Sequence, residues 1–136
     1  MVHKYILDTH TLVWYLEGNK LLGKQAKAII DAAESQMVLP LIALAEAAFI
    51  IERGRTSIPT VPDLLSSVFA DSRIEIYAIT LNIFEWSLTP NGLQIPELHD
   101  RLIVSTGLYL QDLGYTVSIL TKDGNITSAG VLPVIW

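Results

Sequence analysis

Short apolar runs alternate along the chain with longer stretches in which apolar residues recur every three or four positions. The runs predict buried strands at residues 4–7, 37–39, 74–79, 116–121 and 132–135. The longer stretches predict helices at residues 9–16, 23–34, 41–53, 61–70, 81–88 and 97–113. Polar segments at 17–20, 90–92 and 122–125 predict turns. Strands alternating with helices are typical of a three-layer α/β/α sandwich with a mainly parallel sheet.

Length and composition fit one domain over residues 1–136. Hydrophobic residues make up 51% of the chain and charged residues 17%, which is enough to build a core without cross-links. The absence of cysteine excludes disulfides and thiolate metal sites and favours a reducing cytoplasm. No apolar run approaches the ~20 residues of a membrane span, and no signal-peptide pattern opens the chain. We therefore expect a cytoplasmic protein that makes no membrane contact.

The net charge of −5 argues against broad, charge-driven binding to nucleic acid. It does not exclude an enzyme that holds a polyanion through metal ions and a few local cations. The high apolar fraction leaves room for a partner or for self-association.

Two carboxylates directly follow predicted strands. Asp8 ends the first apolar run, and Asp123 follows the strand at 116–121. In parallel α/β sheets, ligands bind at the carboxyl ends of the strands, so neighbouring strands would bring both acids into one crevice. The alternatives are a helix N-cap for Asp8 and an ordinary Asp-Gly turn for Asp123.

Two further carboxylates lie in helical segments. Glu46 interrupts a helix that is apolar on nearly all sides and is therefore expected to be buried, where a carboxylate is costly unless it is paired or binds a metal. The alternative is a solvent gap or a pair with Arg53 or Lys24. Asp100 lies in the first turn of the last long helix, at the end that should face the strand edge; a favourable interaction with the helix dipole is the alternative. That alternative explains Glu97 better than it explains Asp100.

Clustered acids without matching cations repel one another and raise each other's pKa, and a divalent cation relieves this repulsion. Ligands that are all oxygen suit Mg²⁺ or Mn²⁺ rather than zinc. Such a centre activates water and stabilises charge during an in-line displacement at a phosphodiester.

Four short motifs in this order resemble those of the PIN-domain nucleases, in particular the VapC-type toxins of toxin–antitoxin pairs. They are Leu7-Asp8-Thr9-His10, Leu44-Ala45-Glu46, His99-Asp100-Arg101-Leu102-Ile103-Val104 and Leu120-Thr121-Lys122-Asp123. The resemblance covers essentially the whole chain. The third motif is the most specific of the four.

The resemblance implies a metal-dependent endoribonuclease that acts as the toxin of a type II pair. It implies that Asp8, Glu46, Asp100 and Asp123 form the catalytic Mg²⁺ or Mn²⁺ site, supported by the hydroxyls of Thr9 and Thr121. RNA would be the substrate, an antitoxin would cover the acidic groove, and the toxin would form a homodimer. The second motif often carries a serine or threonine shortly before the glutamate, where this chain has Ala43 and Ala45, and this difference bears on the strength of activity.

Several other residues can be interpreted either as functional or as structural. Arg101 and Lys122 are possible substrate contacts, and a surface ion pair is the alternative for Arg101. His10 and His99 fit structural hydrogen bonding better than general-base catalysis. Trp14, Trp86 and Trp136 could stack on bases, although packing in the core or an interface explains them better.

Two other functions compete with the nuclease. A non-catalytic PIN-like binding module is favoured if Glu46 turns away from the other three acids. A phosphatase of the haloacid-dehalogenase type also begins with an aspartate after a strand, but it requires a second aspartate where this chain has His10.

Overall fold

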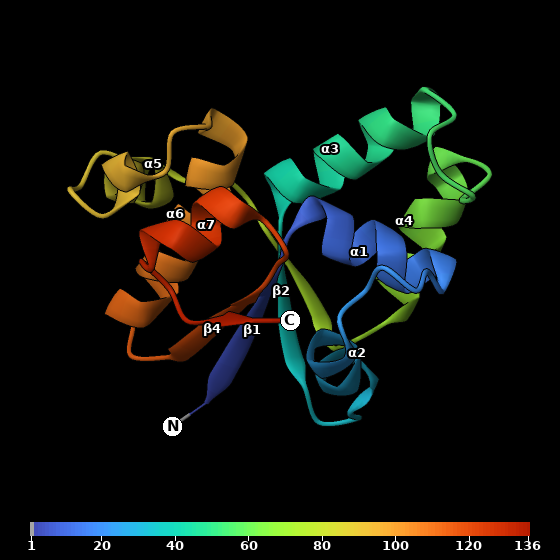
Figure 1. Cartoon of the computed structure of the whole chain (residues 1–136), viewed down its shortest axis with the longest axis horizontal. Coiled ribbons are helices and arrows are strands. Elements are labelled where there is room, and N and C mark those ends of the chain that lie inside the picture. The colour runs from blue at the N-terminus through green and yellow to red at the C-terminus, as the bar shows by residue number, and fades with distance from the viewer. Residues whose placement is uncertain (1) are drawn as a thin grey trace.

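The computed structural model describes residues 2–136 and contains one five-stranded parallel sheet (Figure 1). The strands are β1 (His3–Leu7), β2 (Gln36–Pro40), β3 (Ile74–Tyr77), β4 (Thr116–Leu120) and β5 (Val134–Ile135). Their order in the sheet is β3-β2-β1-β4-β5, and every neighbouring pair is parallel. This confirms the predicted parallel sheet.

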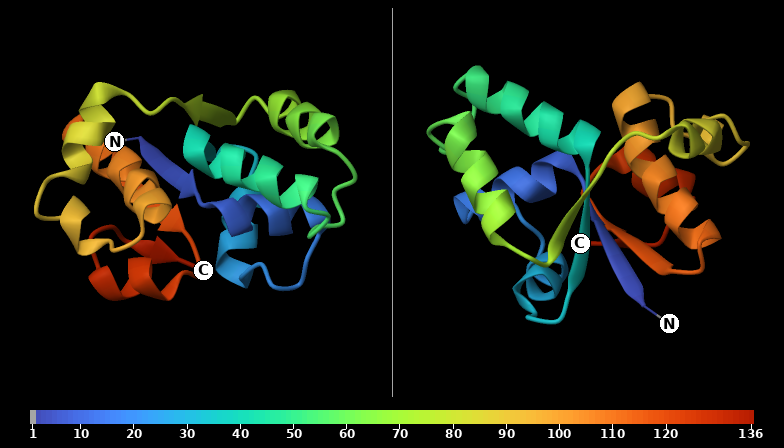
Figure 2. Two further views of the ribbon diagram at one scale, coloured as in Figure 1. Left: turned by 90° about the horizontal axis from the view of Figure 1, so that it is seen from above. Right: turned by 180° about the vertical axis from the view of Figure 1, so that it is seen from behind.

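Helices cover both faces of the sheet (Figures 1 and 2). One layer holds α1 (Thr9–Glu17), α2 (Lys24–Asp31), α3 (Leu41–Glu52) and α4 (Val61–Ala70). The other holds α5 (Leu81–Ser87), the short 3₁₀ helix η1 (Gly92–Gln94), α6 (Leu98–Asp112) and α7 (Gly124–Ala129). The three-layer α/β/α architecture expected from the sequence is thereby confirmed.

The central strands bring distant parts of the chain together at one edge. Leu7 of β1 is in register with Leu120 of β4, so the residues that follow them, Asp8 and Thr121, leave the sheet side by side. Both leucines are at most 2% exposed, as are their neighbours Ile6 and Ile119. Burying one such side chain stabilises the fold by roughly 1.5–3 kcal/mol, so this register resists slipping.

Four local predictions differ from the structure, and one of them is the strand expected at 132–135, which begins at Val134. The predicted turn at 122–125 is partly wrong, because α7 begins at Gly124 with Asp123 as its N-cap. This helix has only one buried apolar residue, Ile126, and therefore leaves no periodic pattern in the sequence. The helix expected at 23–34 ends at Asp31, and the strand expected at 74–79 ends at Tyr77.

The expectation that α3 is buried on all sides is also wrong. Ala43, Leu44, Ala47 and Ile51 face the core, whereas Leu41 is 42% exposed and Phe49 is 54% exposed. Two faces of α3 are therefore apolar for different reasons. One packs in the core, and the other, with Leu41 and Phe49, is an exposed apolar surface. Within residues 2–136, no helix is long and apolar enough to cross a membrane.

Candidate active site

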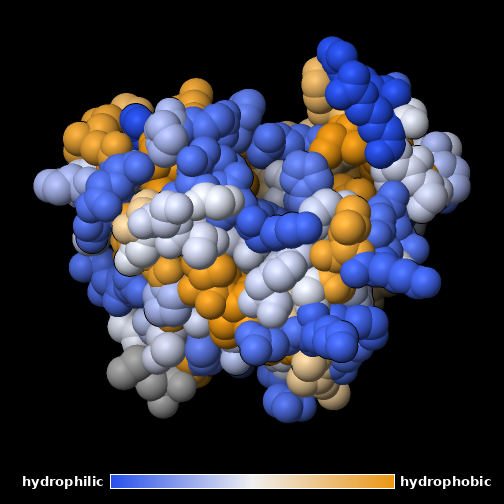
Figure 3. Space-filling model, viewed as in Figure 1, coloured by the Kyte–Doolittle hydropathy of each residue, from blue (hydrophilic) through white to orange (hydrophobic). Residues whose placement is uncertain are grey.

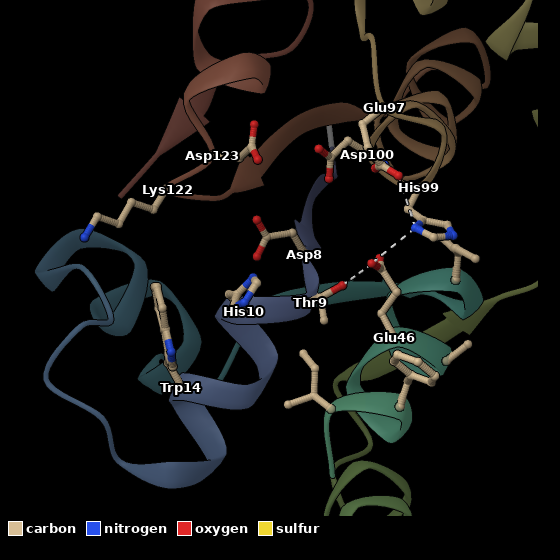
Figure 4. A pocket seen from close by; sticks show the side chains of 14 residues that line it. Asp8, Thr9, His10, Trp14, Glu46, Glu97, His99, Asp100, Lys122 and Asp123 are labelled. Atoms are coloured by element: carbon tan, nitrogen blue, oxygen red, sulfur yellow. Dashed lines mark hydrogen bonds and ion pairs between the residues drawn. The ribbon is translucent and has the colours of Figure 1, made fainter. Parts of the chain in front are cut away.

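A cavity of about 870 Å³ lies at the carboxyl ends of the strands. All four carboxylates singled out from the sequence line it, and each comes from a different part of the fold: Asp8 between β1 and α1, Glu46 on α3, Asp100 on α6, and Asp123 between β4 and α7. The carboxylates of Asp8, Asp100 and Asp123 point towards one space, and Glu46 approaches it from α3 (Figure 4). The parallel sheet therefore gathers acids that are up to 115 positions apart.

Asp8 is the most firmly held of the four. It is 7% exposed and is the N-cap of α1. Its Oδ1 accepts a hydrogen bond from the Thr11 backbone N–H at 2.9 Å, and the Thr11 hydroxyl lies 2.6 Å from the same oxygen. The Thr121 hydroxyl donates to Oδ2. The capping role and the position at the strand edge, which seemed to be alternatives from the sequence, therefore coexist.

Thr121 connects Asp8 to Asp123. Its hydroxyl donates to Asp8 and also accepts the Asp123 backbone N–H at 3.0 Å. The Asp123 side chain accepts the Ile126 N–H at 3.0 Å, which fixes its Oδ1 at the start of α7. Thr121 thus holds the Asp8 carboxylate and the Asp123 backbone, whereas the Asp123 carboxylate is held by the Ile126 N–H.

Glu46 is held by polar groups from two other elements. The Thr9 hydroxyl donates to Oε1 at 3.0 Å, and Nδ1 of His99 lies 3.4 Å from Oε2. The same His99 nitrogen lies 3.2 Å from Oε1 of Glu97. The Glu46 side chain is 32% exposed, so the expected burial is wrong and the solvent-facing alternative agrees with the structure. Within residues 2–136, Glu46 forms no ion pair with Arg53 or Lys24. Thr9 supports Glu46 here, whereas Thr121 supports Asp8.

Asp100 has a different environment. Its side chain accepts no hydrogen bond from residues 2–136, while its backbone N–H donates to the N-cap Glu97 at 2.8 Å. Burial, followed by the charges of Asp123, Glu97, Glu46 and Asp8, raises the pKa of the Asp100 carboxyl to about 7. A positive charge in the cavity would reverse this shift, because it would favour the ionised carboxylate.

The donors suit a hard divalent cation in chemistry, since all four are carboxylates. As the side chains stand, no three His, Cys, Asp or Glu residues among positions 2–136 form a group that could hold a metal ion. Asp8 and Asp123 are fixed by hydrogen bonds, whereas Asp100 is unbonded and could turn towards an ion. Binding would therefore need side-chain adjustment within the cavity.

The two possible substrate contacts are placed differently. Lys122 lines the cavity, where its ammonium lies 5.9 Å from the centre of the Trp14 ring. Arg101 is absent from the lining, and its Nε–H donates to the Ile95 carbonyl at 2.8 Å. The structure therefore brings only Lys122 to the acids.

Sequence reasoning missed one residue of the site, Thr11, and it assigned His99 to structural hydrogen bonding without identifying its partners. Thr11 is completely buried, and its hydroxyl lies 2.6 Å from the Leu120 carbonyl as well as from Asp8. Its position three residues after an N-cap was the available signal. The placement of His99 between Glu46 and Glu97 had no local signal, because it depends on α3 and α6 meeting.

No family model matches the chain, and no curated protein matches it either. Solved structures do match. A toxin–antitoxin complex from Klebsiella pneumoniae is 18% identical with a TM-score of 0.67, over 97% of this chain and 96% of that chain. VapBC2 from Rickettsia felis, bound to a DNA fragment from its promoter, is 15% identical with a TM-score of 0.66, over 97% of each chain.

A third match is VapC20 from Mycobacterium tuberculosis, a toxin that cleaves the sarcin–ricin loop. It is 12% identical with a TM-score of 0.63, over 93% of this chain and 95% of that chain. This chain has the PIN-like fold of the VapC-type toxins. At such low identity the likeness is one of fold, and the PIN-like fold alone does not determine the chemistry.

Proposed function

We propose that this protein is a metal-dependent endoribonuclease and the toxin of a type II toxin–antitoxin pair. The observation that carries the proposal is the convergence of Asp8, Glu46, Asp100 and Asp123 on one cavity at the strand edge. The PIN-like fold, shared with a toxin that cleaves the sarcin–ricin loop, supports the choice of RNA as substrate.

Asp8, Asp100 and Asp123 would hold Mg²⁺ or Mn²⁺. The ion would supply positive charge at the scissile phosphate and lower the pKa of a water molecule. The protein contributes the positions of the acids. Asp8 and Asp123 are fixed by their hydrogen bonds, and Asp100, with its pKa of about 7, is available to release its proton when a cation approaches.

Glu46 would ligate through water or orient the attacking water. The Thr9 hydroxyl and His99 hold its two oxygens from opposite sides, which restricts rotation of the carboxylate. A carboxylate held in this way can accept a proton from water aligned for in-line displacement at phosphorus. Lys122 is the one lysine or arginine in the described lining and would contact the substrate.

The alternative function is a non-catalytic binding module of the same fold. It would be favoured by a Glu46 turned away from the other acids. Instead, Glu46 lines the same cavity, and its charge contributes to the raised pKa of Asp100. This proximity supports the enzyme over the binding module.

The partners of the proposed toxin are an antitoxin, RNA and a second copy of the chain, in the cytoplasm. The matching structure from Klebsiella pneumoniae is a toxin–antitoxin complex, which supports an antitoxin as a partner. Support for a homodimer comes from the exposed face of α5, where Leu81, Phe84 and the following Leu88 are 71%, 47% and 54% exposed. Hydrophobic groups reach the surface over α5 and along α3, with hydrophilic groups between them (Figure 3).

The homodimer is expected to depend on this α5 face. Light scattering of the purified protein should give twice the chain mass, and Leu81→Glu should shift it to the monomer because a charge would be buried in an apolar interface. Leu21→Glu is the control, since Leu21 is also about half exposed (52%) but lies after α1. A wild-type monomer at micromolar concentration would contradict the dimer.

The nuclease is tested by incubating purified protein with structured and single-stranded RNA in Mg²⁺, in Mn²⁺ and in EDTA. Cleavage is expected with either metal and should be lost in EDTA. A small protein encoded beside this chain should stop the cleavage when it is added in equal amount. If RNA stays intact with both metals while calorimetry shows Mn²⁺ binding, the binding module replaces the enzyme.

A further inference from the structure

Trp14 forms one wall of the cavity that holds the acids. It lies on α1, one turn after His10, and both side chains line the cavity beside Asp8 (Figure 4). The ring is partly exposed, although its neighbours Leu12 and Val13 are 1% and 4% exposed. Packing in the core therefore accounts for only part of this large side chain.

Other aromatic groups hold the ring in place. Trp136 meets Trp14 edge to face, with ring centres 5.9 Å apart and an interplanar angle of 62°. Trp136 in turn lies against Gly23, where an added Cβ would come within 2.4 Å of the Trp136 backbone. His10 lies 5.4 Å from Trp14 on the side nearer Asp8. The Trp14 ring is thus fixed beside the carboxylates before any ligand arrives.

Lys122 adds a cation to this wall. Its exposed ammonium lies 5.9 Å from the Trp14 ring centre, at the outer limit of a cation–π contact. A contact this long costs little to break, so the flexible side chain can move to a phosphate. Across the cavity, α3 supplies the apolar side chains of Ile42, Ala45, Phe49 and Ile50. Phe49 is a second exposed ring, but the Arg53 guanidinium already lies over it, 4.2 Å from its centre. Trp14 therefore differs from Phe49 in lying on the same side of the cavity as Lys122, the one lysine or arginine of the described lining.

We propose that Trp14 is a stacking platform for one unpaired RNA base beside the cleaved phosphate, and that Lys122 neutralises the adjoining phosphate. This inference rests on the proposed nuclease function and specifies its substrate as a single-stranded or looped-out segment. A base enclosed in a duplex cannot offer its face to a fixed ring, whereas an unpaired base stacks on an aromatic side chain. Because the chain has a negative net charge, a local contact of this kind would add to what holds RNA at the cavity.

Kinetics give the first test. Stacking contributes about 1–3 kcal/mol per base, so Trp14→Ala should raise KM for single-stranded RNA by about 5- to 150-fold, with kcat changed less than about threefold. Trp14→Phe should recover most of the loss. Phe69→Ala is the matched control, because Phe69 is 67% exposed on α4 and outside the cavity lining. A fall in kcat with KM unchanged would overturn the proposal.

The second test does not depend on cleavage. In the Asp8→Asn background with Mg²⁺, octaadenylate and octauridylate should quench tryptophan fluorescence, and Trp14→Phe should remove most of the quenching. Lys122→Gln should weaken binding and reduce the slope of log affinity against log salt by about 0.7, the value for one phosphate contact on a single strand. The matched control Lys27→Gln, on α2, should leave the slope unchanged.

The outcomes separate the two proposals. If the wild type cleaves no RNA but the octamers still quench the fluorescence of Trp14, the stacking proposal stands and the nuclease proposal is rejected. Cleavage with the same KM in wild type and Trp14→Ala would keep the nuclease and remove the platform. Octamers that bind without quenching, or that do not bind at all, would also overturn the platform.

Discussion

Replacing Asp8 with asparagine is expected to lower the rate of RNA cleavage at least about 1,000-fold. A metal centre contributes several kcal/mol to the stability of the transition state, and each 1.36 kcal/mol is a factor of ten in rate. Asp8 is the least exposed of the four acids and is held by Thr11 and Thr121, so no other carboxylate can take its place. Single-turnover cleavage in Mg²⁺ measures the loss.

The Asp8→Asn protein should still fold. Asparagine retains an Oδ1 acceptor for the Thr11 N–H, so the cap of α1 survives. Its amide nitrogen cannot accept the Thr121 hydroxyl, so the cost in stability is about 1–3 kcal/mol. Circular dichroism and thermal unfolding check this. Asp112→Asn is the control, because Asp112 is exposed at the other end of α6 and should leave the rate unchanged. Wild-type activity in Asp8→Asn would remove Asp8 from the site.

Replacing Asp100 with asparagine is expected to stabilise the metal-free protein at pH 8 while abolishing its cleavage of RNA. Burial and the neighbouring acids raise the pKa of Asp100 from 3.8 to about 7. Between pH 3.8 and about pH 7, the folded protein therefore keeps a proton on Asp100 that the unfolded chain has already released. The free energy of unfolding of the wild type falls as the pH rises through this range. Asparagine has no proton to lose, so the variant escapes this fall.

Asp100 is only about half buried, and solvent screening reduces the expected gain to ~1–2 kcal/mol. Urea unfolding in EDTA at pH 5 and pH 8 measures it, and the difference between variant and wild type should appear mainly at pH 8. Adding Mg²⁺ should stabilise wild type more than Asp100→Asn, because a ligand that binds the folded state raises stability. If Asp100→Asn were less stable than wild type at pH 8, the ionised Asp100 carboxylate would not be destabilising, and the raised pKa would be contradicted. Asp112→Asn again serves as the control.

Local pattern was sufficient for most of the fold. The strands β1, β2 and β4 are short apolar runs bounded by polar residues or proline, and α6 is a long periodic stretch that ends before Gly114. These signals are local because burial imposes a period of two or 3.6 on neighbouring residues. In contrast, α7 depends on a single cap by Asp123 and on one buried residue, Ile126, so no periodicity revealed it.

The candidate site also has some residues that the sequence reveals and some features that only the tertiary structure reveals. Asp8 and Asp123 were recognisable because each directly follows an apolar strand, and parallel strands end at a common edge. Three features were decided by the tertiary structure: the partners of Glu46, the raised pKa of Asp100, and the turning of Arg101 towards Ile95. The first two depend on side chains that are tens of residues apart in the chain, and the third on how the segment before α6 folds back.

By itself, the sequence of this protein determined a parallel α/β sandwich with acids at one edge, because hydrophobic periodicity and strand ends are encoded by adjacent residues. Only the tertiary structure decided how these acids are held and what surrounds them. Thr121 joins Asp8 to Asp123, and Trp14 with Lys122 forms one wall of the cavity. The physical reason is that pKa values, hydrogen bonds and ring contacts depend on distances in space, which arise only once the strands are in register and the helices have packed.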